Sequence, residues 1–168
     1  MNSLSLFKLV STFVFDVDGV MTDGTLLVLE DGQFARRMHI RDGYALQLAV
    51  RRGYQVAVIS GGRSGAVATR LQLLGISDVF LGVEDKAAVL ETYLRKKQLD
   101  RARTLYMGDD IPDLEAIRMA GIRTAPRDAC PEIRAECQYI SPLKGGEGCV
   151  RDVIEKVLRL RGDWPAHT

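Results

Sequence analysis

The sequence has few cysteines, no excess of charge of either sign and no long hydrophobic run. Its three cysteines are odd in number and form no C-x-x-C pair, which argues against a disulfide framework and a zinc site and favours free thiols in a reducing compartment. A net charge of +1 gives no reason to expect a nucleic-acid partner. Lys8 interrupts the moderately apolar start of the chain and no small-residue cleavage site follows. We therefore expect a cytoplasmic protein with no signal peptide and no membrane span.

The composition is that of an ordinary globular protein, with 168 residues of which 46% are hydrophobic and 27% charged. We expect one domain over residues 1–168, without repeats or linkers. Strand-like apolar runs alternate with helix-like stretches, a pattern typical of βαβ units. This predicts an α/β fold with a doubly wound, mostly parallel sheet. Helices are predicted at 43–52, 64–74, 85–97, 112–120 and 148–160.

The segment from Phe13 to Val20 begins as an apolar run, which ends in two carboxylates, Asp16 and Asp18. A glycine turn follows them. Residues i and i+2 of a strand point to the same side, so these two carboxylates are expected near one another. Like charges at such a distance are costly unless a cation neutralises them. Mg²⁺ takes oxygen ligands and commonly sits between carboxylates and a phosphate. The alternative is that the two aspartates only begin and complete a turn.

Two later strand-like runs end in groups of a similar kind. The run 55–59 ends in Ser60 and Gly61, where a hydroxyl and free backbone N–H groups can hold a phosphate. The run 104–107 leads into three further carboxylates at Asp109, Asp110 and Asp113. Ligands of open parallel α/β sheets bind outside the carboxyl ends of the strands, so these groups are predicted to share one site.

Lys86 is predicted at the start of a helix, where a positive charge is unfavourable. Asp85 can cap the helix predicted at 85–97, which places Lys86 in the first turn, where a positive charge opposes the helix dipole. This placement is tolerable if the ammonium group serves an anion. A solvated surface lysine is the alternative.

The segment from about residue 25 to 39 breaks the βα rhythm. Apolar stretches flank Glu30, Asp31 and Gly32, which predicts a β-hairpin with an Asp-Gly turn. The hairpin either overhangs the site as a flap or is an ordinary edge hairpin. The intervals between the motifs leave no room for a cap domain.

The four motifs, in this order, resemble the haloacid dehalogenase superfamily of phosphohydrolases, whose pattern is Asp-x-Asp, Ser or Thr, Lys, and an acidic motif. Segments 16–24, 41–43 and 145–148 are similar to its capless branch that dephosphorylates 3-deoxy-D-manno-octulosonate 8-phosphate. The resemblance implies a Mg²⁺-dependent phosphatase that acts on a small sugar phosphate in lipopolysaccharide precursor synthesis. It also implies a homotetramer in which neighbouring subunits and their hairpin flaps cover the site.

The resemblance implies a role for each motif. Asp16 is expected to be the nucleophile that becomes an aspartyl phosphate, and Asp18 the general acid and base. The expected ligands of Mg²⁺ are Asp16, the backbone oxygen of Asp18, and Asp109, with either Asp110 or Asp113 supporting through water.

The remaining expected contacts are to the substrate. Ser60 and the Gly61 N–H group are expected to bind phosphoryl oxygens, and Lys86, together with Mg²⁺, to offset the charge of the carboxylates. Arg63 and Arg70 lie seven positions apart, so both are predicted on one side of the helix after Ser60, where a guanidinium suits a sugar carboxylate; solvated arginines are the alternative. Thr22 and Asp42, from two of the matching segments, complete the predicted substrate-binding set.

Three alternatives remain open on the sequence. Related phosphatases of nonulosonate 9-phosphates tend to carry Glu at the place of Gly62, which favours the octulosonate. A phosphorylatable receiver module also uses strand-end acids and a lysine, but its phosphoacceptor lies on a later strand than its acidic pair. A non-catalytic assembly domain would not need the intact set of acidic, hydroxyl and lysine residues found here.

Overall fold

The computed structural model describes residues 3–165, so the two ends of the predicted 1–168 domain, 1–2 and 166–168, lie outside the described residues. Six strands form one sheet in the order β5-β4-β1-β6-β7-β8, and every neighbouring pair is parallel. This confirms the predicted doubly wound parallel sheet. The strands are β1 (Thr12–Phe15), β4 (Gln55–Ser60), β5 (Asp78–Leu81), β6 (Thr104–Met107), β7 (Ile122–Ala125) and β8 (Tyr139–Ile140).

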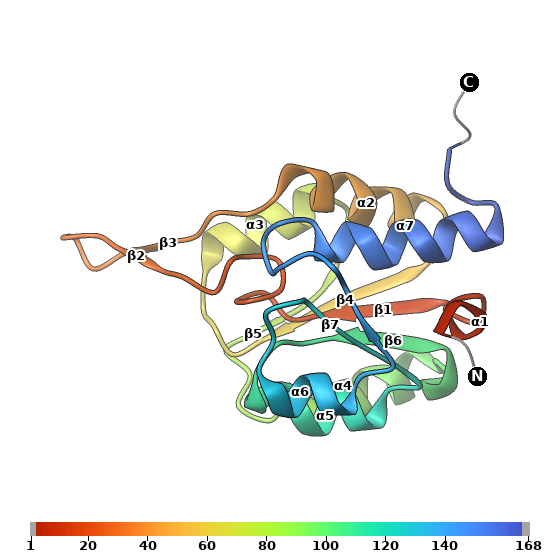
Figure 1. The fold of residues 1–168 in the computed structure, drawn as a ribbon. Coiled ribbons are helices and arrows are strands. Elements are labelled where there is room, and N and C mark those ends of the chain that lie inside the picture. Colours follow the sequence, from red (N-terminus) through yellow and green to blue (C-terminus); the bar gives the residue numbers. More distant parts are fainter. Residues whose placement is uncertain (1–2, 166–168) are drawn as a thin grey trace.

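Helices cover both faces of this sheet (Figure 1). One face carries α2 (Ile40–Arg51), α3 (Gly65–Leu73) and α7 (Cys149–Arg161). The opposite face carries α4 (Lys86–Lys97), α5 (Leu114–Met119) and α6 (Pro131–Glu136). A short helix, α1 (Ser3–Phe7), precedes the first strand, and single 3₁₀ turns, η1 (Arg101–Arg103) and η2 (Ile111–Asp113), flank β6.

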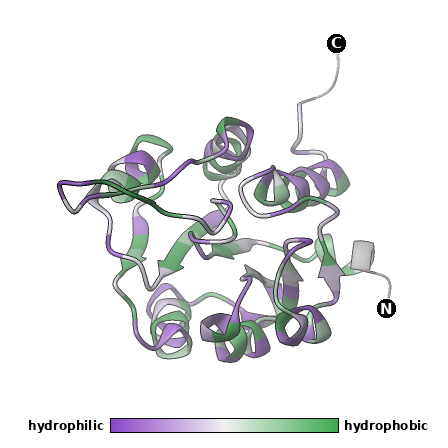
Figure 2. Cartoon of the chain, turned by 60° about the vertical axis from the view of Figure 1, so that its left-hand side comes forward, coloured by the Kyte–Doolittle hydropathy of each residue, from purple (hydrophilic) through white to green (hydrophobic). Residues whose placement is uncertain are grey.

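The strands are apolar because both of their faces are buried. Phe13 and Phe15 of β1 pack into the core beneath α2 and α7, whereas Val14 between them packs into the core beneath α4 and α5. All three side chains are fully buried. Strands buried on both faces form continuous hydrophobic runs, which is why β1, β4 and β6 were recognisable in the sequence. Figure 2 shows the mostly hydrophobic strands between the two helical layers.

The predicted helices are present, with shifted ends. Asp85 caps α4 by accepting the N–H of Ala88 at 2.9 Å, as predicted. Helix α2 begins at Ile40, three residues before its predicted start. The sequence gives no signal for this start, because the N-cap residue is His39, whose side chain makes no capping hydrogen bond. The stretch predicted at 112–120 divides into η2 and α5. Sequence reasoning did not single out β5, β7, β8 or α6, which complete the sheet and its second face.

The predicted hairpin is present as β2 (Leu27–Val28) and β3 (Phe34–Ala35), which pair antiparallel around the turn at Gly32. It projects from the body of the molecule (Figure 1). Both strands are exposed. Residues 3–165 contain no further inserted segment that would form a cap domain.

Strands β1 and β6 enclose the switch point of the sheet. From β1 the chain first builds β4 and β5 on one side, then crosses to β6 on the other. Such switch points are where doubly wound sheets bind ligands. Within the described residues, no helix is long and apolar enough to cross a membrane.

Candidate active site

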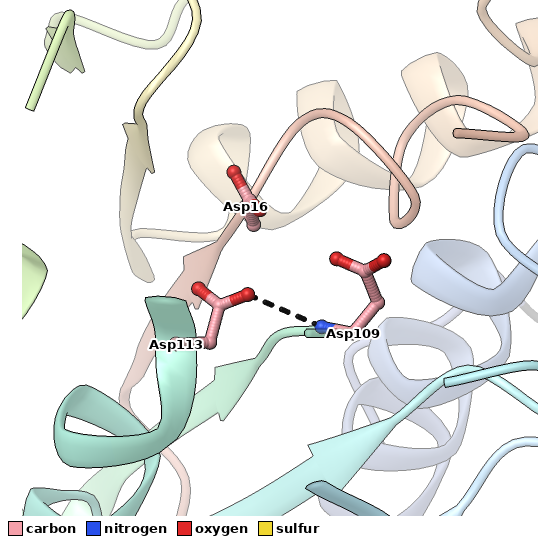
Figure 3. Close-up of side chains that lie close together, drawn as sticks. All are labelled: Asp16, Asp109 and Asp113. Carbon is pink, nitrogen blue, oxygen red and sulfur yellow. Dashed lines mark hydrogen bonds between the residues drawn. The ribbon is translucent and has the colours of Figure 1, made fainter. Parts of the chain in front are cut away.

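Three carboxylates meet beyond the carboxyl ends of β1 and β6 (Figure 3). Asp16 follows β1, Asp109 lies in the loop after β6, and Asp113 ends η2. One oxygen of each lies within 4.8 Å of the others. Asp113 is fixed by the chain itself, because its Oδ2 accepts the backbone N–H of Asp109 at 3.2 Å. Of the two candidates for a supporting metal ligand, Asp113 joins this cluster, whereas Asp110 is exposed beside it.

Lys86 is the cation that lies between two of these carboxylates. Its Nζ atom is 2.8 Å from Asp16 Oδ2 and 2.8 Å from Asp113 Oδ1. The Tyr106 hydroxyl also donates to Asp113 Oδ1, at 2.8 Å. Burial opposes the charge on Lys86, yet the two carboxylates together raise the pKa of its ammonium group. The lysine in the first turn of α4 therefore serves buried anions.

One lysine does not neutralise three carboxylates. Burial, followed by repulsion from Asp113, raises the pKa of Asp16 to about 6. Burial and repulsion from Asp16 and Asp113 raise the pKa of Asp109 to about 7. Lys86 pairs with Asp16 and Asp113 but not with Asp109. A group of oxygen ligands with surplus negative charge fits a hard divalent cation such as Mg²⁺.

Two glycines make room for this cluster. Gly19 has a φ of +84°, and a Cβ atom there would collide with Oδ2 of Asp109. At Gly108, a Cβ atom would collide with the carboxyl group of Asp113. The absence of side chains at both positions lets the backbone approach the carboxylates directly.

The cluster opens into a pocket of about 480 Å³. The hydroxyl of Ser60 lies in this pocket and accepts the N–H of Gly62 at 3.3 Å. Six predicted residues line the same pocket: Asp16, Asp18, Ser60, Gly61, Lys86 and Asp109. The ends of three strands and the start of α4 thus bring together groups suited to attacking, protonating and holding a phosphoryl group.

Asp18 is not part of the three-carboxylate cluster and instead pairs with Arg36, which follows hairpin strand β3. Its Oδ1 accepts from Nε of Arg36 at 2.7 Å, and its Oδ2 accepts from Nη2 at 3.2 Å. Sequence reasoning had not singled out Arg36. The sequence carries no clear signal for it, because strand β3 ends at Ala35 and Phe34, two positions before Arg36, is exposed.

Thr22 and Asp42, predicted to bind substrate, do not line the pocket. The buried Thr22 hydroxyl accepts the N–H groups of Gly19, at 3.2 Å, and Gly24, at 3.3 Å. It thereby shapes the loop after β1. Asp42 is buried between helices and accepts the N–H of Arg151, in the first turn of α7, at 2.8 Å.

The two arginines predicted to share a helix face do not share one. Helix α3 begins at Gly65, so Arg63 lies before it, with its side chain against Gly82. Arg70 lies on the helix against Gly43 of α2. Neither arginine lines the pocket.

The glycine-rich segment 145–148 packs against the loop after β1 and supports it. Gly146 donates its N–H to the carbonyl oxygen of Val20 at 3.0 Å. The thiol of Cys149 donates to the same oxygen at 3.2 Å. A Cβ atom at Gly145 would collide with the backbone oxygen of Gly19. The close packing of two backbones explains the glycines in this motif.

Comparison with known proteins agrees with this geometry. Residues 43–126, half of the chain, match the family described as haloacid dehalogenase-like hydrolase. The 3-deoxy-D-manno-octulosonate 8-phosphate phosphatase KdsC of Yersinia pestis is 32% identical over 145 residues, which cover 86% of this chain and 78% of that protein. The chain belongs to the haloacid dehalogenase-like hydrolases.

Solved structures resemble this hydrolase over nearly its whole length. A 3-deoxy-D-manno-octulosonate 8-phosphate phosphatase from Moraxella catarrhalis, in complex with magnesium, phosphate and KDO, superposes with a TM-score of 0.91 at 34% identity, covering 94% of this chain and 91% of that one. A probable YrbI family phosphatase from Pseudomonas syringae gives a TM-score of 0.92 at 37% identity, covering 96% and 92%.

Proposed function

We propose that this hydrolase is a Mg²⁺-dependent phosphatase that converts 3-deoxy-D-manno-octulosonate 8-phosphate to the free sugar acid and phosphate, in lipopolysaccharide precursor synthesis. The observation that carries the proposal is the set of six predicted residues around one pocket at the switch point of the sheet. Two relatives that match most of the chain support the choice of substrate, because the Yersinia pestis and Moraxella catarrhalis proteins bear the name of this activity.

The metal would be held by Asp16, Asp109 and the backbone oxygen of Asp18, with Asp113 in support. These groups fit the ion because burial, together with repulsion between the carboxylates, raises the pKa of Asp16 and of Asp109. When bound, Mg²⁺ supplies positive charge that offsets the carboxylates and the phosphoryl group.

In the first half of the reaction, a carboxylate oxygen of Asp16 attacks phosphorus and the bond from phosphorus to the sugar oxygen breaks. Asp18, which enters this step as the carboxylic acid, donates its proton to that leaving oxygen. The attacking carboxylate is well fixed, because Oδ1 accepts the N–H of Val17 at 2.6 Å and Oδ2 pairs with Lys86. Lys86, Ser60 and the N–H of Gly61, which line the same pocket, would hold phosphoryl oxygens.

In the second half, Asp18 takes a proton from water, whose oxygen attacks the phosphorus of the aspartyl phosphate. The bond from phosphorus to Asp16 breaks, which releases phosphate and restores the carboxylate. The proton taken from water replaces the one given to the sugar, so Asp18 returns to its starting state.

The test is phosphate release with and without Mg²⁺ on a panel that contains the octulosonate 8-phosphate, a nonulosonate 9-phosphate, a hexose 6-phosphate and p-nitrophenyl phosphate. We expect a strong preference for the first substrate, and no release by Asp16→Asn. A preference for the nonulosonate would change the substrate assignment. No Mg²⁺-dependent release from any of them would favour a phosphorylatable receiver or an assembly module.

We infer that the whole chain works as one phosphatase domain in a cytoplasmic homotetramer, with the hairpin as a flap at subunit interfaces. The support is the exposure of apolar side chains on the projecting hairpin: Leu27 is 64% exposed, Val28 67% and Phe34 55%. The free thiols of the three cysteines fit a reducing compartment.

Light scattering tests this assembly. Leu27→Asp on the hairpin is expected to shift the protein from tetramer to smaller species. Leu73→Asp is the matched control, because Leu73 is 71% exposed but lies on α3. A wild-type monomer, or a tetramer unaffected by Leu27→Asp, would contradict the assignment of the hairpin to the interface.

A further inference from the structure

Arg36 is the side chain through which the exposed hairpin reaches the active site. Both hairpin strands are exposed, yet the side chain of Arg36 is only 8% exposed. Arginine is rarely buried this far unless it is paired. Here the guanidinium contacts both carboxylate oxygens of Asp18, at 2.7 and 3.2 Å. A two-point contact of this kind fixes the plane of the carboxylate as well as its position.

The next residue along the chain behaves differently. The side chain of Arg37 is 87% exposed and pairs with Asp23 at 3.1 Å, at the surface. Two adjacent arginines in one segment thus differ in burial and in partner. Arg37 is therefore a matched control for Arg36.

The orientation of the Asp18 carboxylate depends on its ion pair with Arg36. In residues 3–165, Arg36 supplies the only side chain that donates hydrogen bonds to the Asp18 carboxylate. Gly62 provides the space, because a Cβ atom there would lie 2.9 Å from Asp18 Oδ2 and 3.1 Å from Arg36 Nη2. The ion pair therefore sits directly against the loop proposed to hold phosphate.

We propose that Arg36 is a positioning residue for proton transfer. The inference rests on the proposed function, in which Asp18 gives a proton to the leaving sugar oxygen and then takes one from water. Through the ion pair, Arg36 directs the Asp18 carboxylate toward these oxygens, so the hairpin and the proton-transfer group are held together. A displacement of about 1 Å in such a group costs roughly 100-fold in rate.

The test compares a leaving group that needs a proton with one that does not. Arg36→Met keeps an apolar stem and removes the ion pair. A sugar alkoxide must be protonated as it leaves, whereas p-nitrophenolate leaves without a proton. We expect kcat on the octulosonate phosphate to fall by about 10- to 100-fold. The rate of phosphoenzyme formation from p-nitrophenyl phosphate should stay within about threefold of wild type, because that step needs no proton donor.

A spectroscopic signature separates this role from a structural one. Because Asp18 must next activate water, stopped-flow absorbance of Arg36→Met should show a stoichiometric burst of p-nitrophenolate followed by slow turnover. Arg36→Lys should recover part of the lost rate, since a single ammonium restores charge but not the two-point contact. Arg37→Met should behave as wild type. The Mg²⁺ concentration for half-maximal rate should be unchanged in all three variants.

Three results would overturn the inference, and they are distinguishable. Equal losses on both substrates without a burst would remove the positioning role and leave the proposed function standing. A rise in kcat for Arg36→Met would mean that the pair holds Asp18 away from the substrate. A wild-type enzyme with no Mg²⁺-dependent release from either substrate would overturn the proposed function and this inference with it.

Discussion

The carboxyl group of Asp109 lies against the Cα atom of Gly19, where the chain leaves no room for a side chain. Gly19→Ala would place a methyl group on Oδ2 of Asp109 and also strain a backbone φ of +84°. We expect the variant to fold but to push Asp109 away from Asp16 and Asp113. Isothermal titration with Mg²⁺ should then show binding weakened by about tenfold or more.

Gly53→Ala separates this displacement from backbone strain. Gly53 has a φ of +85°, and a Cβ atom there would have nothing within 4 Å. This control should lose about 1 kcal/mol of stability and bind Mg²⁺ normally. Equal Mg²⁺ affinity in both variants would mean that Asp109 is not a ligand.

The neighbouring aspartates of the acidic motif should differ in their effect on the metal. Asp109→Asn is expected to raise the Mg²⁺ concentration for half-maximal rate by about 100-fold, because it removes a charged ligand. Without metal the same variant should be more stable than wild type, since repulsion from Asp16 and Asp113 contributes to the raised pKa of Asp109. The exposed Asp110→Asn should change both quantities far less, because Asp110 adds only a smaller repulsion to Asp109. Activity in both variants should vanish on chelation with EDTA.

Lys86→Met should be the costliest lysine substitution for stability. It leaves the buried carboxylates of Asp16 and Asp113 without their cation, a loss of about 3 kcal/mol in the free energy of unfolding. Lys97→Met is the control, because Lys97 is 40% exposed and its ion pair with Asp78 is worth less than about 1 kcal/mol. Urea unfolding without metal measures both. Similar losses would show that Lys86 is not structurally coupled to the cluster.

Asp42 should make stability depend on pH. Burial raises its pKa from 3.8 to about 6, although the hydrogen bond from Arg151 and the nearby His39 lower it. Between these two values the unfolded chain has lost the proton while the folded protein retains it, so stability falls as pH rises. Asp42→Asn removes this penalty. Urea unfolding should show a gain of about 3 kcal/mol at pH 8 that shrinks to about half at pH 5.

Asp31→Asn is the matched control for Asp42→Asn, because Asp31 is exposed. Asp31→Asn should alter stability equally at both pH values, because its side chain stays in water when the chain folds. A pH-independent effect of Asp42→Asn would contradict the assignment of the penalty to burial of its charge.

The central strands and their motifs could be predicted because local sequence determines them. Strands β1, β4 and β6 are buried on both faces, so each forms an apolar run that stops where the polar motif begins. In a parallel sheet the carboxyl ends share one edge, which places Asp16, Ser60 and Asp109 together without further information. Asp85 as the cap of α4 followed from its side-chain chemistry alone.

The contacts that sequence reasoning missed depend on distant segments. Strand β1 ends at Phe15, so the alternation used to place Asp18 beside Asp16 does not extend to Asp18. Its partner, Arg36, comes from a hairpin 18 residues away. Helix α3 starts at Gly65, two residues after Arg63, so the helical spacing used to place Arg63 beside Arg70 does not include Arg63.

The segment 145–148, which supports the loop after β1, also determines at which stage of protein synthesis the site can form. The Cys149 thiol and the Val20 carbonyl oxygen are 129 residues apart in sequence. A nascent chain on the ribosome therefore contains every proposed catalytic and metal-binding residue well before the backbone that supports their loop has been synthesised. Metal capture and turnover should therefore begin only after residues 145–149 have been synthesised, so that shorter nascent chains do not hydrolyse sugar phosphates.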